Sequence, residues 1–172
     1  MTVTLTGFMG VGKSTIADML SRLLLCKYID LDLFIEQREK MTISEIFSEK
    51  GEIYFREKES EALSEILAQL NSKLQILSLG GGALISHKNC ELVKNNSVCI
   101  YLKADFGTLS RRLVKGKKNR PFLNAVSEKE EEEHLRQLFA IREEGYLKAA
   151  THTISTDDKN IRQIVNEIIS LL

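Results

Sequence analysis

A nine-residue run close to the start of the chain constrains its fold more than any other feature. Residues 7–15 read Gly-Phe-Met-Gly-Val-Gly-Lys-Ser-Thr, which fits the P-loop pattern of Gly, four residues and then Gly-Lys-Ser. The run follows residues 2–6, whose β-branched residues predict a strand. It precedes apolar residues at helical spacing, which predict a helix over residues 14–25. Strand, glycine-rich loop and helix in this order indicate a binding site for nucleotide phosphates.

Each residue type in this loop has a physical reason. Glycines let the backbone fold around an anion, so that N–H groups and the N-terminus of the next helix point at phosphate oxygens. Lys13 supplies positive charge to the β- and γ-phosphates, and the Ser14 hydroxyl is a ligand for Mg²⁺. A dinucleotide-binding fingerprint fits less well, because it needs Gly or Ala where the chain has Thr15. We therefore expect the chain to bind a nucleoside triphosphate.

Length and composition indicate one soluble domain. The chain has 172 residues, of which 43% are hydrophobic and 28% charged. The formal net charge is zero, so we expect no nucleic-acid partner and no anionic membrane partner. No stretch approaches the roughly 18 apolar residues that span a bilayer, and we identify no signal peptide before the first strand. The three cysteines lack metal-ligand spacing, which favours reduced thiols and a cytoplasmic location.

The remaining pattern predicts an α/β fold. Strands are expected at residues 2–6, 28–31, 74–79, 97–102 and 151–155. Helices are expected at residues 14–25, 33–40, 43–50, 54–71, 87–95, 106–114, 128–149 and 160–171. This alternation predicts a parallel five-stranded sheet with helices on both faces, in a single domain over residues 1–172. The first strand carries threonines, which can be buried if their hydroxyls form local hydrogen bonds.

Two further groups of residues are candidates for binding the molecule that accepts the phosphoryl group. Asp30 and Asp32 lie at the end of the second predicted strand, and residues two apart on a strand face the same side. At the carboxyl edge of a parallel sheet one carboxylate can hold Mg²⁺ and the other a substrate hydroxyl; the alternative is a pair that caps the next helix. Gly80, Gly81 and Gly82 permit a ligand to approach the main chain closely; the alternative is a plain turn.

A basic segment late in the chain predicts a mobile loop. Residues 115–121 read Lys-Gly-Lys-Lys-Asn-Arg-Pro and contain the only proline. A basic loop that closes over a kinase site excludes water and supplies charge during phosphoryl transfer. We therefore interpret this segment as a lid.

Together these segments resemble the shikimate kinases, small P-loop enzymes of aromatic amino-acid biosynthesis. The resemblance covers nearly the whole chain and rests on six elements in the right order. They are the phosphate loop at residues 7–15, Asp30-x-Asp32, Phe55-Arg56 with Glu59, the run Ser78-Leu79-Gly80-Gly81-Gly82, Arg120-Pro121-Phe122-Leu123, and Arg142 with Tyr146. The last element departs from the family, because Glu144-Gly145 stands where Pro-Leu is usual. We expect this departure to alter the bend of the helix after Arg142.

The resemblance implies transfer of the γ-phosphoryl group of ATP to the 3-hydroxyl of shikimate, with Mg²⁺ as cofactor, in a cytoplasmic monomer. It implies a nucleoside-monophosphate-kinase-like three-layer sandwich, with a substrate-binding region over residues 33–60 and a mobile lid over residues 113–124. The implied catalytic residues are Lys13, Asp32 and Arg120. The implied nucleotide-binding residues are Gly10, Val11, Gly12, Lys13, Ser14, Thr15, Arg112 and Arg120. The implied substrate-binding residues are Asp32, Arg56, Gly80, Gly81, Gly82 and Arg142, and the implied metal pair is Ser14 and Asp30.

Three alternatives stand beside this interpretation. Another small-molecule P-loop kinase, such as a gluconate kinase, uses the same phosphate machinery, and gluconate also bears a carboxylate and hydroxyls. A nucleoside monophosphate kinase is disfavoured, because no base-reading pocket is recognisable in the sequence. A regulatory module that binds nucleotide without catalysis is disfavoured, because Lys13, Asp32 and Arg120 are all present.

Overall fold

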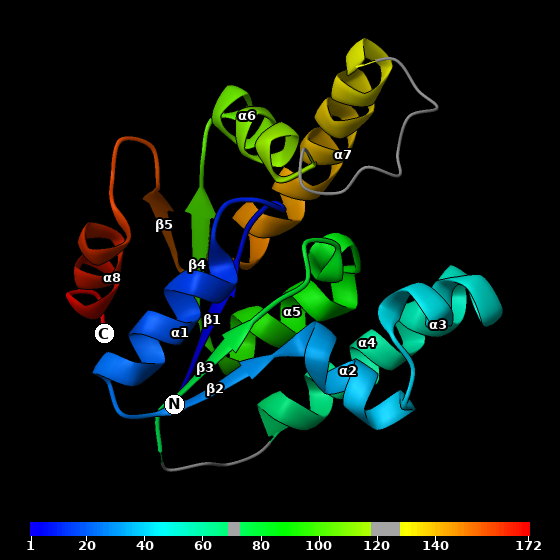
Figure 1. Ribbon diagram of the computed structural model, residues 1–172. Coiled ribbons are helices and arrows are strands. Elements are labelled where there is room, and N and C mark those ends of the chain that lie inside the picture. Colours follow the sequence, from blue (N-terminus) through cyan, green and yellow to red (C-terminus); the bar gives the residue numbers. More distant parts are fainter. Residues whose placement is uncertain (69–72, 118–127) are drawn as a thin grey trace.

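The computed structural model describes residues 1–68, 73–117 and 128–172. Its centre is a five-stranded sheet in which all neighbouring strands are parallel, in the order β2-β3-β1-β4-β5 (Figure 1). The strands are β1 (Thr2–Thr6), β2 (Lys27–Asp30), β3 (Gln75–Ser78), β4 (Val98–Lys103) and β5 (His152–Ser155). The predicted α/β fold with a five-stranded parallel sheet is confirmed. Because the strands are parallel, all of their carboxyl ends meet at one edge, where the functional loops begin.

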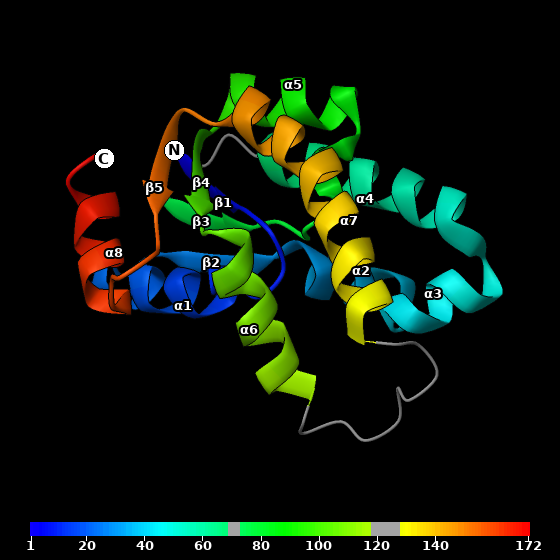
Figure 2. The same cartoon turned by 90° about the horizontal axis from the view of Figure 1, so that it is seen from above.

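Helices cover both faces of this sheet, which makes three layers (Figure 2). On one face lie α1 (Lys13–Leu23) and α8 (Ile161–Ile169). On the other lie α4 (Gly51–Ala68), α5 (His87–Asn96) and α7 (Glu128–Ala149), while α6 (Phe106–Lys117) leaves the carboxyl end of β4. A short 3₁₀ helix, η1 (Ala83–Ile85), was not predicted from the sequence. None of the helices in the described ranges is both long and apolar enough to cross a bilayer.

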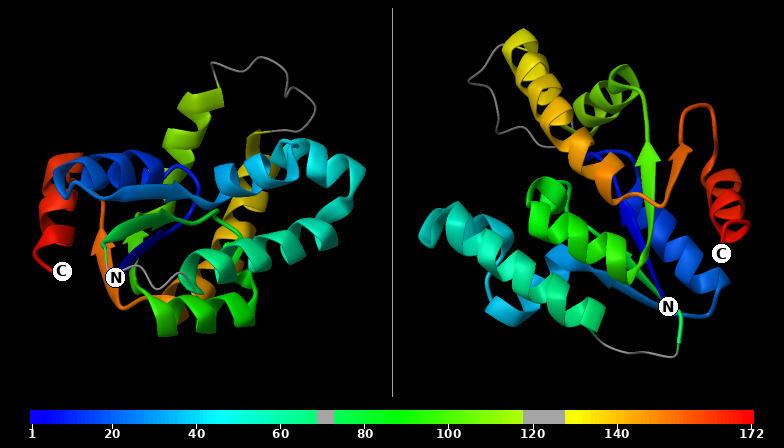
Figure 3. Two further views of the ribbon diagram at one scale, coloured as in Figure 1. Left: turned by 90° about the horizontal axis from the view of Figure 1, so that it is seen from below. Right: turned by 180° about the vertical axis from the view of Figure 1, so that it is seen from behind.

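An arm of helices extends beyond the edge of the sheet. It consists of α2 (Leu31–Glu39), α3 (Ile43–Glu49) and the first part of α4 (Figure 3). The helix α3 begins with a capping box, in which the Thr42 hydroxyl accepts from the Glu45 N–H at 3.2 Å and the Glu45 carboxylate accepts from the Thr42 N–H at 2.7 Å. The capping box fixes the start of α3 and thereby marks the turn between α2 and α3.

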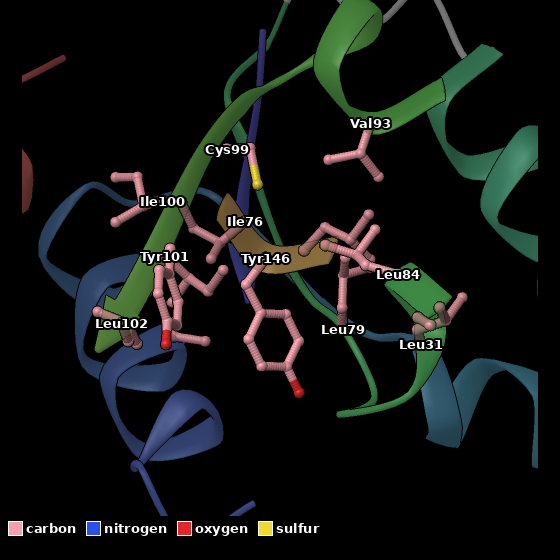
Figure 4. Close-up of a cluster of buried hydrophobic side chains, with 14 of the residues drawn as sticks. Leu31, Ile76, Leu79, Leu84, Val93, Cys99, Ile100, Tyr101, Leu102 and Tyr146 are labelled. Atoms are coloured by element: carbon pink, nitrogen blue, oxygen red, sulfur yellow. The ribbon is translucent and has the colours of Figure 1, made fainter. Parts of the chain in front are cut away.

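The central strands are buried on both faces, as parallel strands between helices must be. Val3, Leu5, Ile76 and Ile100 have no exposed surface. Figure 4 shows part of this core, which includes Ile76, Leu79 and Ile100 as well as the aromatic residues Tyr101 and Tyr146. Burial of these side chains stabilises the sheet that holds the loops at its carboxyl edge.

The second strand ends earlier than predicted. Asp30 is the last residue of β2 and the N-cap of α2, since its carboxylate accepts from the N–H groups of Asp32 at 3.1 Å and Leu33 at 3.3 Å. Asp32 therefore lies in the first turn of α2, and the prediction that both carboxylates share one face of a strand is wrong. An aspartate that satisfies the free N–H groups of a helix start favours the helix over continued strand.

The helix α6 extends to Lys117, so the first residues of the predicted lid over 113–124 are helical. The rest of that lid, including Arg120, lies outside the described residues.

Two buried threonines of β1 differ in how their hydroxyls are satisfied. The Thr4 hydroxyl donates to the Ser97 hydroxyl at 2.9 Å, so its partner is 93 residues away in the sequence and not local as expected. The Thr6 hydroxyl is fully buried and has no hydrogen-bond partner among the described residues. A buried polar group without a partner destabilises the fold, because it loses its hydrogen bonds to water.

This difference predicts opposite effects of the same substitution. We expect Thr4→Val to lower the free energy of unfolding by about 1 kcal/mol, since it removes a hydrogen bond. Thr6→Val keeps the shape and removes an unsatisfied hydroxyl, so we expect it to leave stability unchanged or raise it by about 1 kcal/mol. Urea denaturation of the two variants measures both effects. Equal destabilisation by the two substitutions would contradict this account.

Candidate active site

The phosphate loop joins β1 to α1 and leads directly into the N-terminus of that helix. Gly10 has a φ of 81° and Gly12 a φ of 100°, values in the left-handed region that glycine adopts without strain. Gly12 is the N-cap of α1, and no side chain caps that helix. The first N–H groups of α1 are therefore available to an anion.

Lys13 is held inside this loop. Its Nζ donates to the carbonyl oxygens of Gly7 at 2.7 Å and Phe8 at 3.1 Å. Burial lowers the pKa of Lys13 to about 8, although the negative charges of Asp32 and Asp30 act in the opposite direction. The ammonium group is thus partly stripped of water before any phosphate arrives, which strengthens its attraction to an anion.

Asp30 connects the phosphate loop to the second strand. Its Oδ2 accepts from the Tyr28 hydroxyl at 3.0 Å and from the Ser14 hydroxyl at 3.4 Å. A hydroxyl and a carboxylate beside a phosphate site suit Mg²⁺, which takes oxygen ligands and usually keeps several waters. Within the described ranges no group of three or more His, Cys, Asp or Glu side chains could hold a metal ion. The pair therefore fits a cation that is held largely by substrate phosphates and water.

Three consecutive glycines after β3 each lie against a different polar side chain. A Cβ at Gly80 would come within 2.6 Å of Asp32 Oδ1, and a Cβ at Gly82 within 2.9 Å of an Arg56 nitrogen. A Cβ at Gly81 would lie 3.4 Å from an Arg142 nitrogen. Any side chain at Gly80 or Gly82 would displace these groups. The loop thus brings together one carboxylate and two guanidinium groups from three different helices.

The surroundings of Asp32 act on its pKa in opposite directions. Burial raises its pKa above the usual range, and so does the charge of Asp30, while Lys13 and Arg56 act to lower it. A carboxylate with a raised pKa is a better proton acceptor than an ordinary one. It also makes a strong hydrogen bond to a hydroxyl group.

Arg56 is held in place by two carboxylates. It donates to Glu59 Oε2 at 2.9 Å and to Glu52 Oε1 at 3.2 Å. Glu59 is only 1% exposed, and burial raises its pKa while Arg56 acts to lower it. The buried Glu59 therefore fixes one side of the guanidinium, while the more exposed Glu52 holds the other side.

Arg142 comes from α7 and has an unsatisfied donor. Its guanidinium lies 5.7 Å from the centre of the Phe8 ring, within the range of a cation–π contact. Its Nε is buried and has no hydrogen-bond partner in the part of the chain that the structure describes. A buried guanidinium donor without a partner suits the binding of an anionic ligand.

A pocket lies between the phosphate loop, α6 and the segment that follows β5. Its volume is about 280 Å³, and its lining includes Gly12, Thr15, Arg112, Thr156 and Lys159. The Thr156 hydroxyl is buried and has no hydrogen-bond partner among the described residues. Polar groups beside a phosphate loop suit the base and sugar of a nucleotide.

The structure brings together most of the predicted site residues. The residues gathered at the carboxyl edge of the sheet are Gly10, Val11, Gly12, Lys13, Ser14, Thr15, Asp30, Asp32, Arg56, Gly80, Gly81, Gly82, Arg112 and Arg142. Arg120 lies outside the described residues.

Sequence reasoning assigned no role to four residues that the structure places at the site. Glu59 could have been assigned from its spacing, since it lies one helical turn after Arg56. Tyr28 lies two residues before Asp30 on the same strand, a spacing that gives a weaker signal. Thr156 and Lys159 carry no local signal, because only the fold brings them to the phosphate loop.

Comparisons with known proteins agree with this geometry. A family model described as shikimate kinase matches residues 9–172. The shikimate kinase of Flavobacterium johnsoniae is 37% identical over 171 residues, which cover 99% of this chain and 98% of that protein. The shikimate kinase of Chlorobium phaeobacteroides is 41% identical, with 96% of this chain and 87% of that protein covered.

Solved structures of shikimate kinases also resemble this chain. Shikimate kinase from Acinetobacter baumannii in complex with shikimate superposes with a TM-score of 0.84 at 33% identity, covering 99% of this chain and 91% of that chain. The shikimate kinase structure from Bacteroides thetaiotaomicron superposes with a TM-score of 0.86 at 32% identity, covering 99% and 97%. On the strength of the family model and of these full-length relatives, the chain belongs to the shikimate kinase family.

Proposed function

We propose that this chain transfers the γ-phosphoryl group of ATP to the 3-hydroxyl of shikimate, giving ADP and 3-phosphoshikimate. The observation that carries the proposal is the cluster beside the phosphate loop, in which Asp32, Arg56 and Arg142 each lie against one of three consecutive glycines. Membership of the shikimate kinase family supports shikimate as the acceptor.

The two arginines are assigned to the carboxylate of shikimate. Guanidinium groups bind carboxylates through pairs of parallel hydrogen bonds. The unsatisfied Nε of Arg142 and the support of Arg56 by Glu59 favour this role. Gly80, Gly81 and Gly82 allow the substrate to approach the backbone of the loop.

Asp32 is assigned to the reacting hydroxyl. Its carboxylate orients that hydroxyl and, with a pKa raised by burial, accepts its proton as the new bond to phosphorus forms. Most of the acceleration comes from positioning and electrostatic stabilisation, because phosphoryl transfer needs little covalent help from the protein.

The donor side is assigned to the phosphate loop. Residues 10–15 cradle the phosphates through backbone N–H groups, and Lys13 leaves its carbonyl partners to contact the β- and γ-phosphates. Ser14 and Asp30 are proposed to hold Mg²⁺, which neutralises phosphate charge when it is bound. Arg112, Thr156 and Lys159 are proposed to line the base and sugar pocket.

The remaining assignments concern the whole chain. We propose one domain over residues 1–172, with a substrate-binding region over residues 33–60 and a lid over residues 113–124 that brings Arg120 to the transferring phosphate. We also propose that the enzyme is a cytoplasmic monomer without nucleic-acid or membrane partners. The equal numbers of basic and acidic residues, 24 of each, support the absence of such polyanionic partners.

Acceptor-dependent ADP release tests the reaction. Purified protein with ATP and Mg²⁺ is expected to release ADP with shikimate and not with gluconate or without an acceptor. Lys13→Ala, which removes the cation from the phosphate loop, serves as the control for contaminating kinases and is expected to be inactive. Release with gluconate alone would overturn the substrate assignment, and ATP binding without release for any acceptor would overturn the reaction.

Arg56→Ala tests the assignment of the substrate carboxylate. Loss of a charged hydrogen-bonding partner costs about 1.5–3 kcal/mol, so we expect the KM for shikimate to rise by about 10- to 100-fold. The KM for ATP is expected to stay within about twofold, since Arg56 lies on the acceptor side. Arg22→Ala is the matched control, because Arg22 also pairs with a carboxylate on its own helix, that of Asp18, but its side chain is 78% exposed and lies outside residues 33–60. A shikimate KM that does not change in Arg56→Ala contradicts the assignment.

The lowered pKa of Lys13 predicts a pH dependence of ATP binding. Above a pH of about 8 the amine of the free enzyme loses its proton and its positive charge, so we expect the affinity for ATP to fall as the pH rises through this value. Calorimetric titration with ATP and Mg²⁺ measures the affinity. Asp32→Asn removes a negative charge that raises the pKa of Lys13, so the fall is expected at lower pH in this variant. A fall that begins only near the ordinary lysine pKa of about 10.4 would refute the prediction.

A further inference from the structure

Gly145 lies within α7 at a point where the helix touches the loop that follows the three glycines. It is buried, and a Cβ added there would lie 2.1 Å from the Leu84 carbonyl oxygen and 3.0 Å from the Leu84 carbonyl carbon. A real Cβ does not approach another atom so closely, so a side chain at position 145 would have to push α7 and η1 apart by roughly 1 Å. Glycine also weakens a helix relative to alanine, so local helix stability alone does not favour it here.

The Leu84 carbonyl cannot easily move away from such a side chain. Its oxygen accepts from the Cys90 thiol at 3.0 Å, which ties it to α5. Two hydrogen bonds brace η1 from within, from Ala83 N–H to the Gly80 carbonyl and from Ile85 N–H to the Gly82 carbonyl, both at 3.1 Å. A displacement of Leu84 would therefore be transmitted to the three glycines.

The same face of α7 makes the other contacts with this loop. Arg142, Gly145 and Tyr146 are separated by three and four residues, so they lie on one side of the helix. Arg142 lies against Gly81, and the Tyr146 hydroxyl donates to the Gly81 carbonyl. Figure 4 shows Tyr146 and Leu84 in one buried cluster, with the Tyr101 ring beside Tyr146 at 5.3 Å between centroids.

We propose that Gly145 is a positioning residue for substrate binding, because its missing side chain sets the distance between α7 and the glycine loop and so the place of Arg142 against Gly81. This inference rests on the proposed role of Arg142 in binding the substrate carboxylate. Gly145 itself touches no substrate. A shift of roughly 1 Å in a substrate-orienting group is enough to reduce productive binding strongly.

Steady-state kinetics of Gly145→Ala test the proposal. We expect the KM for shikimate to rise at least about fivefold while the KM for ATP stays within about twofold, because the three atoms nearest to an added Cβ all belong to Leu84, on the acceptor side of the site. Calorimetric binding of shikimate without nucleotide is expected to weaken by the same factor. Glu144→Ala is the control, since it introduces the same residue at the neighbouring exposed position and breaks only the surface pair with Lys148. We expect both KM values of this control to match those of the wild type.

Other outcomes overturn the proposal. A folded Gly145→Ala variant with an unchanged shikimate KM removes the positioning role, and an equal rise in both KM values shows a merely structural role. If Gly145→Ala does not fold, Tyr146→Phe decides, because it removes the hydrogen bond to Gly81 and keeps the ring in the core. A raised shikimate KM in Tyr146→Phe then supports the docking of α7 as the cause, and an unchanged one overturns it.

Arg142→Gln separates this inference from the proposed function. If Arg142→Gln raises the shikimate KM and Gly145→Ala does not, only the role of Gly145 fails. If neither substitution changes it, the assignment of Arg142 to the substrate fails as well.

Discussion

The active site depends on a stretch of backbone that carries no side chains. Because Gly80, Gly81 and Gly82 leave their surface bare, groups from three helices lie directly against one loop. The loop begins at the end of β3, which pairs with both β1 and β2, so its position is fixed by the centre of the sheet. The position of the site is therefore set by the end of a strand in the centre of the sheet, and the surrounding helices contribute the charged side chains.

The charged side chains at this site lie close to side chains of opposite charge, in surroundings that are partly shielded from water. Lys13 lies near Asp30 and Asp32, and Arg56 is bonded to the buried Glu59. Buried charges are tolerated when they are paired and hydrogen-bonded. Arg142 is the exception, since one of its buried donors has no partner among the described residues. In the proposed function the carboxylate of the substrate is the partner of this guanidinium.

Much of the fold was predictable because its signals are local. The phosphate loop and the alternation of strands and helices specify backbone conformation within a few residues. The end of β2 was misplaced, because strand periodicity and helix capping compete at Asp30 and only the packed structure shows that the cap prevails. The structure also contains η1, whose three residues are too few to give a periodic signal.

The site was predictable to the extent that its residues belong to short motifs. Lys13, Asp32 and Arg56 stand in patterns that a reader can recognise, whereas Thr156 reaches the phosphate loop only through the order of the strands. The tight contact between Gly145 and Leu84 was equally hidden, because it joins two segments that are far apart in the sequence. Such contacts depend on packing between helices, for which no local pattern exists.

Asp30 serves both halves of the site at once. One of its oxygens caps α2, the helix that carries Asp32, and the other accepts from Ser14 of the phosphate loop. A cation that draws this carboxylate toward the nucleotide acts at the same time on the first turn of α2. In the proposed arrangement this side chain couples the two substrates, and any effect of the nucleotide on the affinity for the acceptor is then matched by an equal effect of the acceptor on the affinity for the nucleotide.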